Sequence, residues 1–171
     1  MVQYRRNQVP GGTYFLTLTL LDRRASHLVE NVDALRGSFR KVQASHSFSI
    51  DAVVIMPDHL HLLCTLPEGD ADYSERVRLL KRYFTQSLTH RTAERRSLWQ
   101  PRFWEHTIRD EDDFRRHVDY IHFNQVKHGY VNAAHEWPHS SFHRYVRQGL
   151  LPLDWGGAMH DYDMPIDGFG E

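Results

Sequence analysis

Residues 48–66 read FSIDAVVIMPDHLHLLCTL. Apolar and polar side chains alternate over Phe48–Met56 and again over His59–Leu66, which is the period of a half-buried strand. Pro57 and Asp58 lie between the two runs and are typical of a tight turn. The stretch therefore predicts two adjacent antiparallel strands that are joined as a hairpin.

The segments on either side of this hairpin alternate between strand and helix patterns. Tyr14–Leu20 alternates like a strand, and Glu105–Arg109 is compatible with a short one. Three other segments carry apolar residues at helical spacing, and the last of these helices should begin near Asp110 and end at Gly129. The order strand, helix, strand, strand, helix, strand, helix predicts an α+β domain. We expect an antiparallel sheet with packed helices, of the ferredoxin-like or RRM-like type. The helical stripes are Val32, Leu35, Phe39 and Val42, then Val77, Leu80, Phe84 and Leu88, and finally Phe114, Val118 and Ile121.

The composition suits one compact domain of 171 residues, of which 40% are hydrophobic and 25% are charged. Cys64 is the only cysteine, which excludes a disulfide framework and a multi-cysteine zinc site and fits a reducing cytoplasm. No apolar run is long enough to cross a bilayer, and residues 1–10 are too polar for a secretory signal. We therefore expect a cytoplasmic protein with no membrane partner.

Charge is distributed unevenly along the chain, although the net charge is only −1. Residues 76–102 contain eight basic residues and one acidic residue, whereas residues 150–171 contain five acidic residues and neither Lys nor Arg. This asymmetry is typical of a protein that presents part of its surface to phosphates. Because the final segment is also rich in Gly, Pro and Asp, we predict a domain over residues 1–149 and an acidic tail over residues 150–171.

Two histidines of the predicted hairpin are candidate metal ligands. Side chains alternate along a strand, so His59 and His61 project from the same face, one pleat apart. Neutral imidazoles placed in this way can share one divalent ion. A His-x-His pair on a strand is more often two half-exposed side chains with no ligand, so the pair by itself does not establish a metal site.

Tyr120 and Asn124 lie one turn apart on the last predicted helix, and so they share one face of it. Alone, the tyrosine is a packing residue and the asparagine a surface residue. If both lie over His59 and His61, the set supplies three metal ligands and an oxygen nucleophile. A tyrosine hydroxyl can attack a phosphodiester to form a covalent phosphotyrosine, and a divalent ion stabilises the charge that develops.

Together with motifs along most of the chain, these residues make the sequence resemble the REP-associated tyrosine transposases, relatives of the single-tyrosine HUH transposases. The resemblance implies the HUH endonuclease fold, a divalent ion (Mg²⁺ or Mn²⁺) held by His59, His61 and Asn124, and Tyr120 as the nucleophile. Gln125 stands where the common family pattern has proline, which leaves the ligand position unchanged. The motifs are Tyr4-Arg5-Arg6, Pro10-Gly11-Gly12-Thr13-Tyr14-Phe15, Met56-Pro57-Asp58-His59-Leu60-His61, Trp99-Gln100-Pro101-Arg102-Phe103-Trp104-Glu105-His106, Tyr120-Ile121-His122-Phe123-Asn124-Gln125-Val126-Lys127-His128-Gly129 and Ser140-Ser141-Phe142.

The resemblance also implies a partner, single-stranded DNA with a REP-type hairpin, and it is compatible with a monomer or a homodimer. Basic residues would then contact backbone phosphates, and aromatic residues would stack on unpaired bases. Each has a plainer interpretation as a solvated charge or a core side chain. The expected phosphate contacts are Arg76, Lys81, Arg82, Arg95, Arg96 and Arg102, and the expected stacking residues are Tyr83, Trp99, Phe103 and Trp104.

Three functions remain to be compared. The leading hypothesis is a metal-dependent DNA nickase and strand transferase that acts through Tyr120. A hairpin-binding regulator that no longer cuts DNA is the second, although a pure binder has no need to keep the histidines, the tyrosine and the asparagine together. A metal hydrolase that uses His59, His61 and water is the third, but it lacks an evident third strong ligand and gives Tyr120 no role.

Overall fold

The computed structural model describes residues 6–89 and 97–156. Four strands form one sheet in the order β2-β3-β1-β4, and every neighbouring pair is antiparallel. This arrangement confirms the predicted α+β class with helices packed on an antiparallel sheet. The elements are β1 (Thr13–Thr19), α1 (His27–Glu30), α2 (Val32–Ser45), β2 (Ser49–Ile55), β3 (His59–Thr65), α3 (Tyr73–Thr89), β4 (Trp104–Thr107), α4 (Glu111–Lys127), the 3₁₀ turn η1 (Ala134–Glu136) and α5 (Phe142–Arg147).

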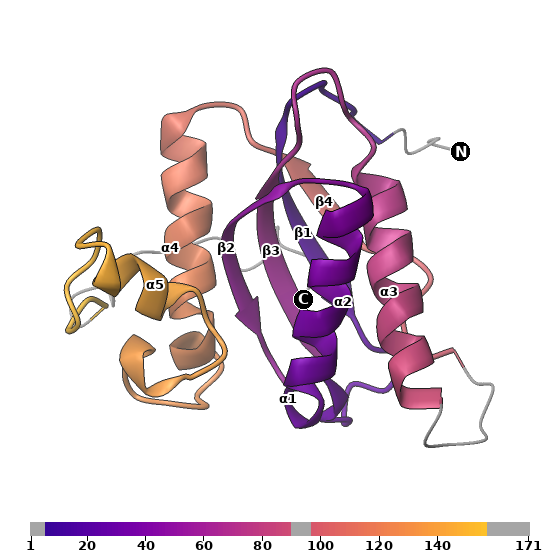
Figure 1. The fold of residues 1–171 in the computed structure, drawn as a ribbon. Coiled ribbons are helices and arrows are strands. Elements are labelled where there is room, and N and C mark those ends of the chain that lie inside the picture. The colour runs from indigo at the N-terminus through magenta and orange to yellow at the C-terminus, as the bar shows by residue number, and fades with distance from the viewer. Residues whose placement is uncertain (1–5, 90–96, 157–171) are drawn as a thin grey trace, which may run out of the picture.

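Helices cover both faces of the sheet, as Figure 1 shows, with α2 in front of the strands, α3 to their right and α4 to their left beside β2. On the first face, Leu16, Leu18 and Leu62 are buried against α2 and α3. On the second face, Phe15 and Leu63 pack with the apolar stripe of α4. The alternation that the sequence predicts for β1 and β3 therefore sends one set of side chains to each layer.

The pairing of β1 with β3 decides which side chains meet on the α4 face. Thr17 lies opposite His61 and Thr19 lies opposite His59. Both threonines are buried, with 1% and 5% of their surface exposed. Because directly opposed residues project to the same side of a sheet, the two histidines and the two threonines form one polar patch inside this layer.

The ends of α4 follow the signals in the sequence. Asp110 caps the helix by accepting a hydrogen bond from the backbone N–H of Asp113 at 2.8 Å. Gly129 has a φ of +73°, the left-handed conformation that ends a helix and that glycine adopts at little cost. The helix that carries the candidate nucleophile therefore starts and stops where the sequence predicts.

Other elements differ from the prediction. β4 begins at Trp104 rather than Glu105 and ends at Thr107, because its ladder to β1 covers only four residue pairs. The sequence did not predict α1, η1 or α5, which are too short to show a helical period. Of the predicted tail over residues 150–171, only residues 150–156 are described, and there the Trp155 ring lies 5.8 Å from the ring of Phe142. The boundary between domain and tail remains a prediction.

No helix in the described ranges is both long enough and apolar enough to span a membrane.

Candidate active site

His59 and His61 lie one pleat apart on β3 and point toward the α4 layer. Both are buried, with 2% and 0% of their surface exposed. Their rings meet edge to face, with centroids 5.0 Å apart. The strand alternation thus brings the two imidazoles together in the interior rather than at the surface.

Each imidazole is oriented by a hydrogen bond at its Nδ1 atom. In His59 this atom lies 2.8 Å from Oδ1 of Asp58. In His61 it lies 2.8 Å from Oγ1 of Thr17, the residue opposite on β1. A proton on Nδ1 leaves the lone pair on Nε2, and this arrangement fixes the rings of many metal-bound histidines.

Asp58 keeps His59 in that state. Its carboxylate also accepts a hydrogen bond from Nε of Arg23, at 2.5 Å. Burial by itself raises the pKa of Asp58, but the hydrogen bond and charge of His59, together with Arg23, outweigh burial and hold the pKa below its usual value. Asp58 is therefore ionised at neutral pH and accepts a hydrogen bond from the Nδ1–H group of His59.

The donor set fits a divalent metal ion. Nε2 of His59 is buried and has no hydrogen-bond partner within the described residues. A buried nitrogen in this condition is costly unless a ligand satisfies it. The ring of His61 lies beside it, and neutral imidazole binds several divalent ions.

Tyr120 and Asn124 approach this pair from α4. The Tyr120 ring lies edge to face with that of His61, with centroids 5.2 Å apart, and Phe15 packs against both rings. Asn124 follows one helical turn later and is fully buried. The structure thus brings the predicted nucleophile into contact with one predicted ligand and places the third predicted ligand on the next turn of the same helix.

Lys127 and His128 also belong to this region, although the sequence reasoning gave neither a role. Nζ of Lys127 donates a hydrogen bond to Oη of Tyr120 at 3.4 Å and lies 4.9 Å from the centre of its ring. The His128 ring lies 5.4 Å from that of His59. The sequence contained a signal for both residues, because positions seven and eight residues after Tyr120 lie on the same side of a helix as Tyr120.

Trp104 extends the site toward the β4 edge of the sheet. It lies opposite Thr17 on β1, which in turn lies opposite His61 on β3. Strands are about 4.8 Å apart, so the backbone of Trp104 stands roughly 10 Å from that of His61 on the same face. Since 40% of its surface is exposed, Trp104 is the one predicted stacking residue on this row that solvent reaches freely.

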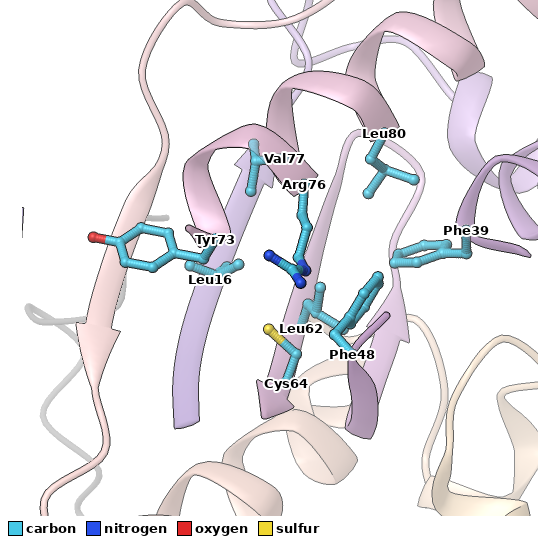
Figure 2. A pocket seen from close by; sticks show the side chains of 9 residues that line it. All are labelled: Leu16, Phe39, Phe48, Leu62, Cys64, Tyr73, Arg76, Val77 and Leu80. Atoms are coloured by element: carbon cyan, nitrogen blue, oxygen red, sulfur yellow. The ribbon is translucent and has the colours of Figure 1, made fainter. Parts of the chain in front are cut away.

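Arg76 does not fit the role that the sequence suggested. Only 6% of it is exposed, and Figure 2 shows its guanidinium inside the layer between α3 and the sheet, near Leu62 and Cys64. The guanidinium donates hydrogen bonds to the backbone oxygens of Ser47 and Asp72 and to the carboxylate of Asp70, at 2.7–2.9 Å. Arg76 is thus a buried structural residue, because both of its terminal guanidinium nitrogens already donate hydrogen bonds within the fold.

Lys81 joins two segments rather than standing free. It donates to the backbone oxygen of Gln100 at 2.9 Å and faces the rings of Trp99 and Phe103. Burial lowers its pKa to about 8, with a smaller contribution from the charge of Arg6. Lys81 therefore holds the segment before β4 against α3. Because its side chain is only partly exposed, a phosphate can contact it from one side only.

The remaining predicted DNA contacts divide by exposure. Arg82 and Arg102 are exposed, whereas Arg95 and Arg96 lie outside the described residues. Trp99 is a core residue with 5% of its surface exposed. Two further rings, predicted to stack on bases, are each covered by a cation: Tyr83 by Lys41 at 4.1 Å and Phe103 by Arg6 at 4.0 Å.

A second group of potential metal ligands lies near the start of α4. One ligand atom from each of His106, Asp113 and His117 lies within 4.8 Å of the others. The Asp113 carboxylate already accepts from Nε2 of His106 at 2.8 Å and from the backbone N–H of Arg109 at 3.0 Å. These bonds tie α4 to β4, since Asp113 and His117 lie one helical turn apart on α4 and His106 lies on the strand that precedes this helix.

Comparisons with known proteins agree with the fold. Residues 12–124 match the family model described as "Transposase IS200 like". A REP-associated tyrosine transposase of Escherichia coli K12 is 46% identical over 162 residues, which cover 95% of each chain. A solved structure of a REP-associated tyrosine transposase bound to a REP hairpin superposes with a TM-score of 0.87 at 45% identity. That match covers 100% of this chain and 98% of the solved one.

Proposed function

The chain belongs to the IS200-like transposases, and on this premise we propose that it is a metal-dependent single-stranded DNA endonuclease and strand transferase that acts on hairpin DNA. The observation that carries the proposal is the contact of Tyr120 with His61, at a centroid distance of 5.2 Å. It places a phenol beside two imidazoles that are oriented for a metal. No other function considered for this chain makes use of all three side chains.

The proposed reaction is a transesterification at phosphorus. Oη of Tyr120 attacks a backbone phosphate, a new P–O bond forms, and the bond to the departing strand end breaks. Tyr120 loses its proton, and the departing strand end gains one as a hydroxyl group. A hydroxyl of a second strand then attacks the phosphotyrosine and reverses these changes, so strand transfer needs no nucleotide cofactor.

His59, His61 and Asn124 would hold the metal ion. When bound, a divalent ion supplies charge that polarises the scissile phosphate. The chain's own part is to orient these donors through Asp58 and Thr17, and to hold Tyr120 against His61. Lys127 stands 3.4 Å from the phenol oxygen, where its positive charge favours the deprotonated nucleophile.

Hairpin DNA is proposed as the substrate because the solved relative with the same fold is bound to a REP hairpin. On this chain, exposed Trp104 lies in the same cross-strand row as His61 and offers a surface on which an unpaired base can stack. Arg102 and Arg82 are exposed cations that can meet backbone phosphates. The row would place the stacked base about two strands away from the metal ligands.

The proposal is tested by trapping the covalent adduct. Wild-type protein with Mn²⁺ or Mg²⁺ and a labelled REP-type hairpin with single-stranded flanks should give a protein–DNA band that survives denaturing electrophoresis. Tyr120→Phe should lose this band while it binds the hairpin nearly as well, because only the attacking oxygen is removed. Excess EDTA should also abolish the band.

The regulator alternative predicts a different result. If wild-type protein binds the hairpin tightly in the presence of metal and yields neither adduct nor cut strand, the chain is a non-cleaving binder. If Tyr120→Phe still cuts the strand at a substantial rate, the phosphotyrosine mechanism is wrong.

A further inference from the structure

A groove separate from the candidate active site opens at the β2 edge of the sheet, between α2 and residues 139–144. Its volume is about 300 Å³, at the lower end of the range of roughly 300–1,000 Å³ that is usual for ligand pockets. The β2 edge is the opposite side of the sheet from β4, where Trp104 lies. A ligand in this groove would therefore make contacts that the active-site row does not.

The charged residues that line the groove are all basic: Arg36, Arg40 and Arg144. Arg144 is fixed in the wall, because it donates to the backbone oxygens of Ile50 and Asp51. Arg36 forms an ion pair with an exposed carboxylate, Asp33, at 3.3 Å. Arg40 is exposed and forms no hydrogen bond or ion pair with any residue that the structure describes. The groove is thus electropositive, with one guanidinium available to an anion.

Polar and apolar groups line different parts of the same groove. Nδ1 of His139 is buried and lacks a hydrogen-bond partner among the described residues. Oγ of Ser140 accepts a hydrogen bond from the backbone N–H of Phe142 at 3.1 Å, so the hydroxyl hydrogen of Ser140 can be donated to a ligand. The apolar wall is made by Phe39, Ile50, Val53 and Ile55.

We propose that this groove binds one nucleotide of the single-stranded DNA that flanks the hairpin, with its phosphate at Arg36 and Arg40 and its base against the apolar wall. The inference rests on the proposed function, since that function makes DNA the available polyanion. Planar guanidinium groups suit phosphate, and His139 and Ser140 supply hydrogen bonds to a base or sugar. A groove of this size accommodates one such unit and not a stretch of duplex.

The first test does not depend on cleavage. The 5′-phosphorylated dinucleotide pTpT is titrated into the full chain, and NMR follows the imidazole of His139 and the Nε–Hε group of Arg40. Saturable shifts at both groups are expected in the wild-type protein. Arg40→Gln should reduce the affinity for pTpT by about three- to tenfold, because one phosphate contact is lost.

The second test uses hairpin DNA with single-stranded flanks. Arg40→Gln and Arg36→Gln should each weaken binding by about three- to tenfold, and each should lower the slope of log K against log salt by about one. Arg115→Gln is the matched control, because this exposed arginine of α4 is balanced by Glu111 and Asp112. Thermal melting checks that each variant is folded.

The outcomes separate the groove from the proposed function. If pTpT shifts His139 while the wild-type protein gives no covalent adduct, the groove stands and the proposed function fails. If the wild-type protein cuts the hairpin but pTpT leaves His139 unshifted and both groove variants bind like Arg115→Gln, the groove inference is overturned. It is also overturned if tetraglutamate shifts His139 and pTpT does not, because the groove would then recognise an acidic peptide.

Discussion

Lys127 is the residue beside Tyr120 whose charge bears most directly on the nucleophile. A phenol has an ordinary pKa near 10, so at neutral pH it needs a neighbouring positive charge in order to react as an anion. The Lys127 ammonium lies within hydrogen-bond reach of Oη and stands over the Tyr120 ring, 4.9 Å from its centre. Lys127 therefore acts through Tyr120, as a positioning and charge-stabilising residue.

Replacing Lys127 by Met should lower the cleavage rate by roughly 100-fold, which is the lower end of the range for loss of one preorganised donor. The pH at which the rate rises should move upward, because the phenol loses its stabilising neighbour. Lys127→Arg should restore part of the rate and of the pH profile. Single-turnover cleavage as a function of pH measures both. If Lys127→Met slows cleavage equally at every pH, Lys127 serves only the packing of α4.

For the individual site residues, the sequence predicted the residue types but not the hydrogen-bond partners that orient them. The alternation of His59 and His61 and the one-turn spacing of Tyr120 and Asn124 are local patterns, and local patterns can be read without a structure. The bond from Thr17 to His61 depends on strand register between segments 44 residues apart, which no local period encodes.

α4 is the element that carries the chemistry, and Asp113 ties its first turn to the sheet. The Asp113 carboxylate meets His106 of β4 and the backbone N–H of Arg109, and its side chain is only 3% exposed. Burial by itself raises the pKa of Asp113, but these hydrogen bonds, with the charges of His106 and His117, lower it to about 2. A carboxyl with a lowered pKa stabilises the fold above its unfolded pKa near 3.9 and loses that effect as pH falls toward 2.

Asp113→Asn should therefore reduce the free energy of unfolding at pH 7 by about 2 kcal/mol. Between pH 4 and pH 2 the wild-type protein should lose this difference, so the two stability curves should converge at the acid end. Urea denaturation at several pH values provides the measurement. Asp112→Asn is the control, because its side chain is 79% exposed on the same turn. A constant gap between Asp113→Asn and wild type down to pH 2 would contradict the assignment.

Among the elements, long periodic segments were predictable and short ones were not. The hairpin of β2 and β3, the strand β1 and the limits of α4 follow from alternation, a capping aspartate and a terminal glycine. α1 and α5 contain only four and six residues, and tertiary contacts rather than a helical period create them. Arg76 sits beside the apolar stripe of α3 as expected, but only the acceptors Ser47, Asp70 and Asp72 decide that it is buried.

On the scale of the whole molecule, the two edges of the sheet differ in character. The β4 edge carries exposed Trp104 in line with the candidate active site, and the β2 edge carries the basic groove. The net charge of −1 does not reveal this difference, because it sums basic and acidic residues over the whole chain. A flexible strand could contact both edges, whereas a compact anion would contact one. The sequence predicted a basic surface that includes Arg76, but in the folded chain Arg76 is buried and does not contribute to that surface.

The burial of Cys64 has a practical consequence for following this molecule in solution. Burial raises the pKa of its thiol to about 12, so almost no thiolate forms at neutral pH. A maleimide dye should leave the folded wild-type protein unlabelled for hours and should react once the chain is unfolded in urea, as mass spectrometry can verify. Pro101→Cys, at an exposed position three residues before Trp104, should then take up a single dye. Its fluorescence would report strand arrival at the β4 edge without prior removal of the native cysteine.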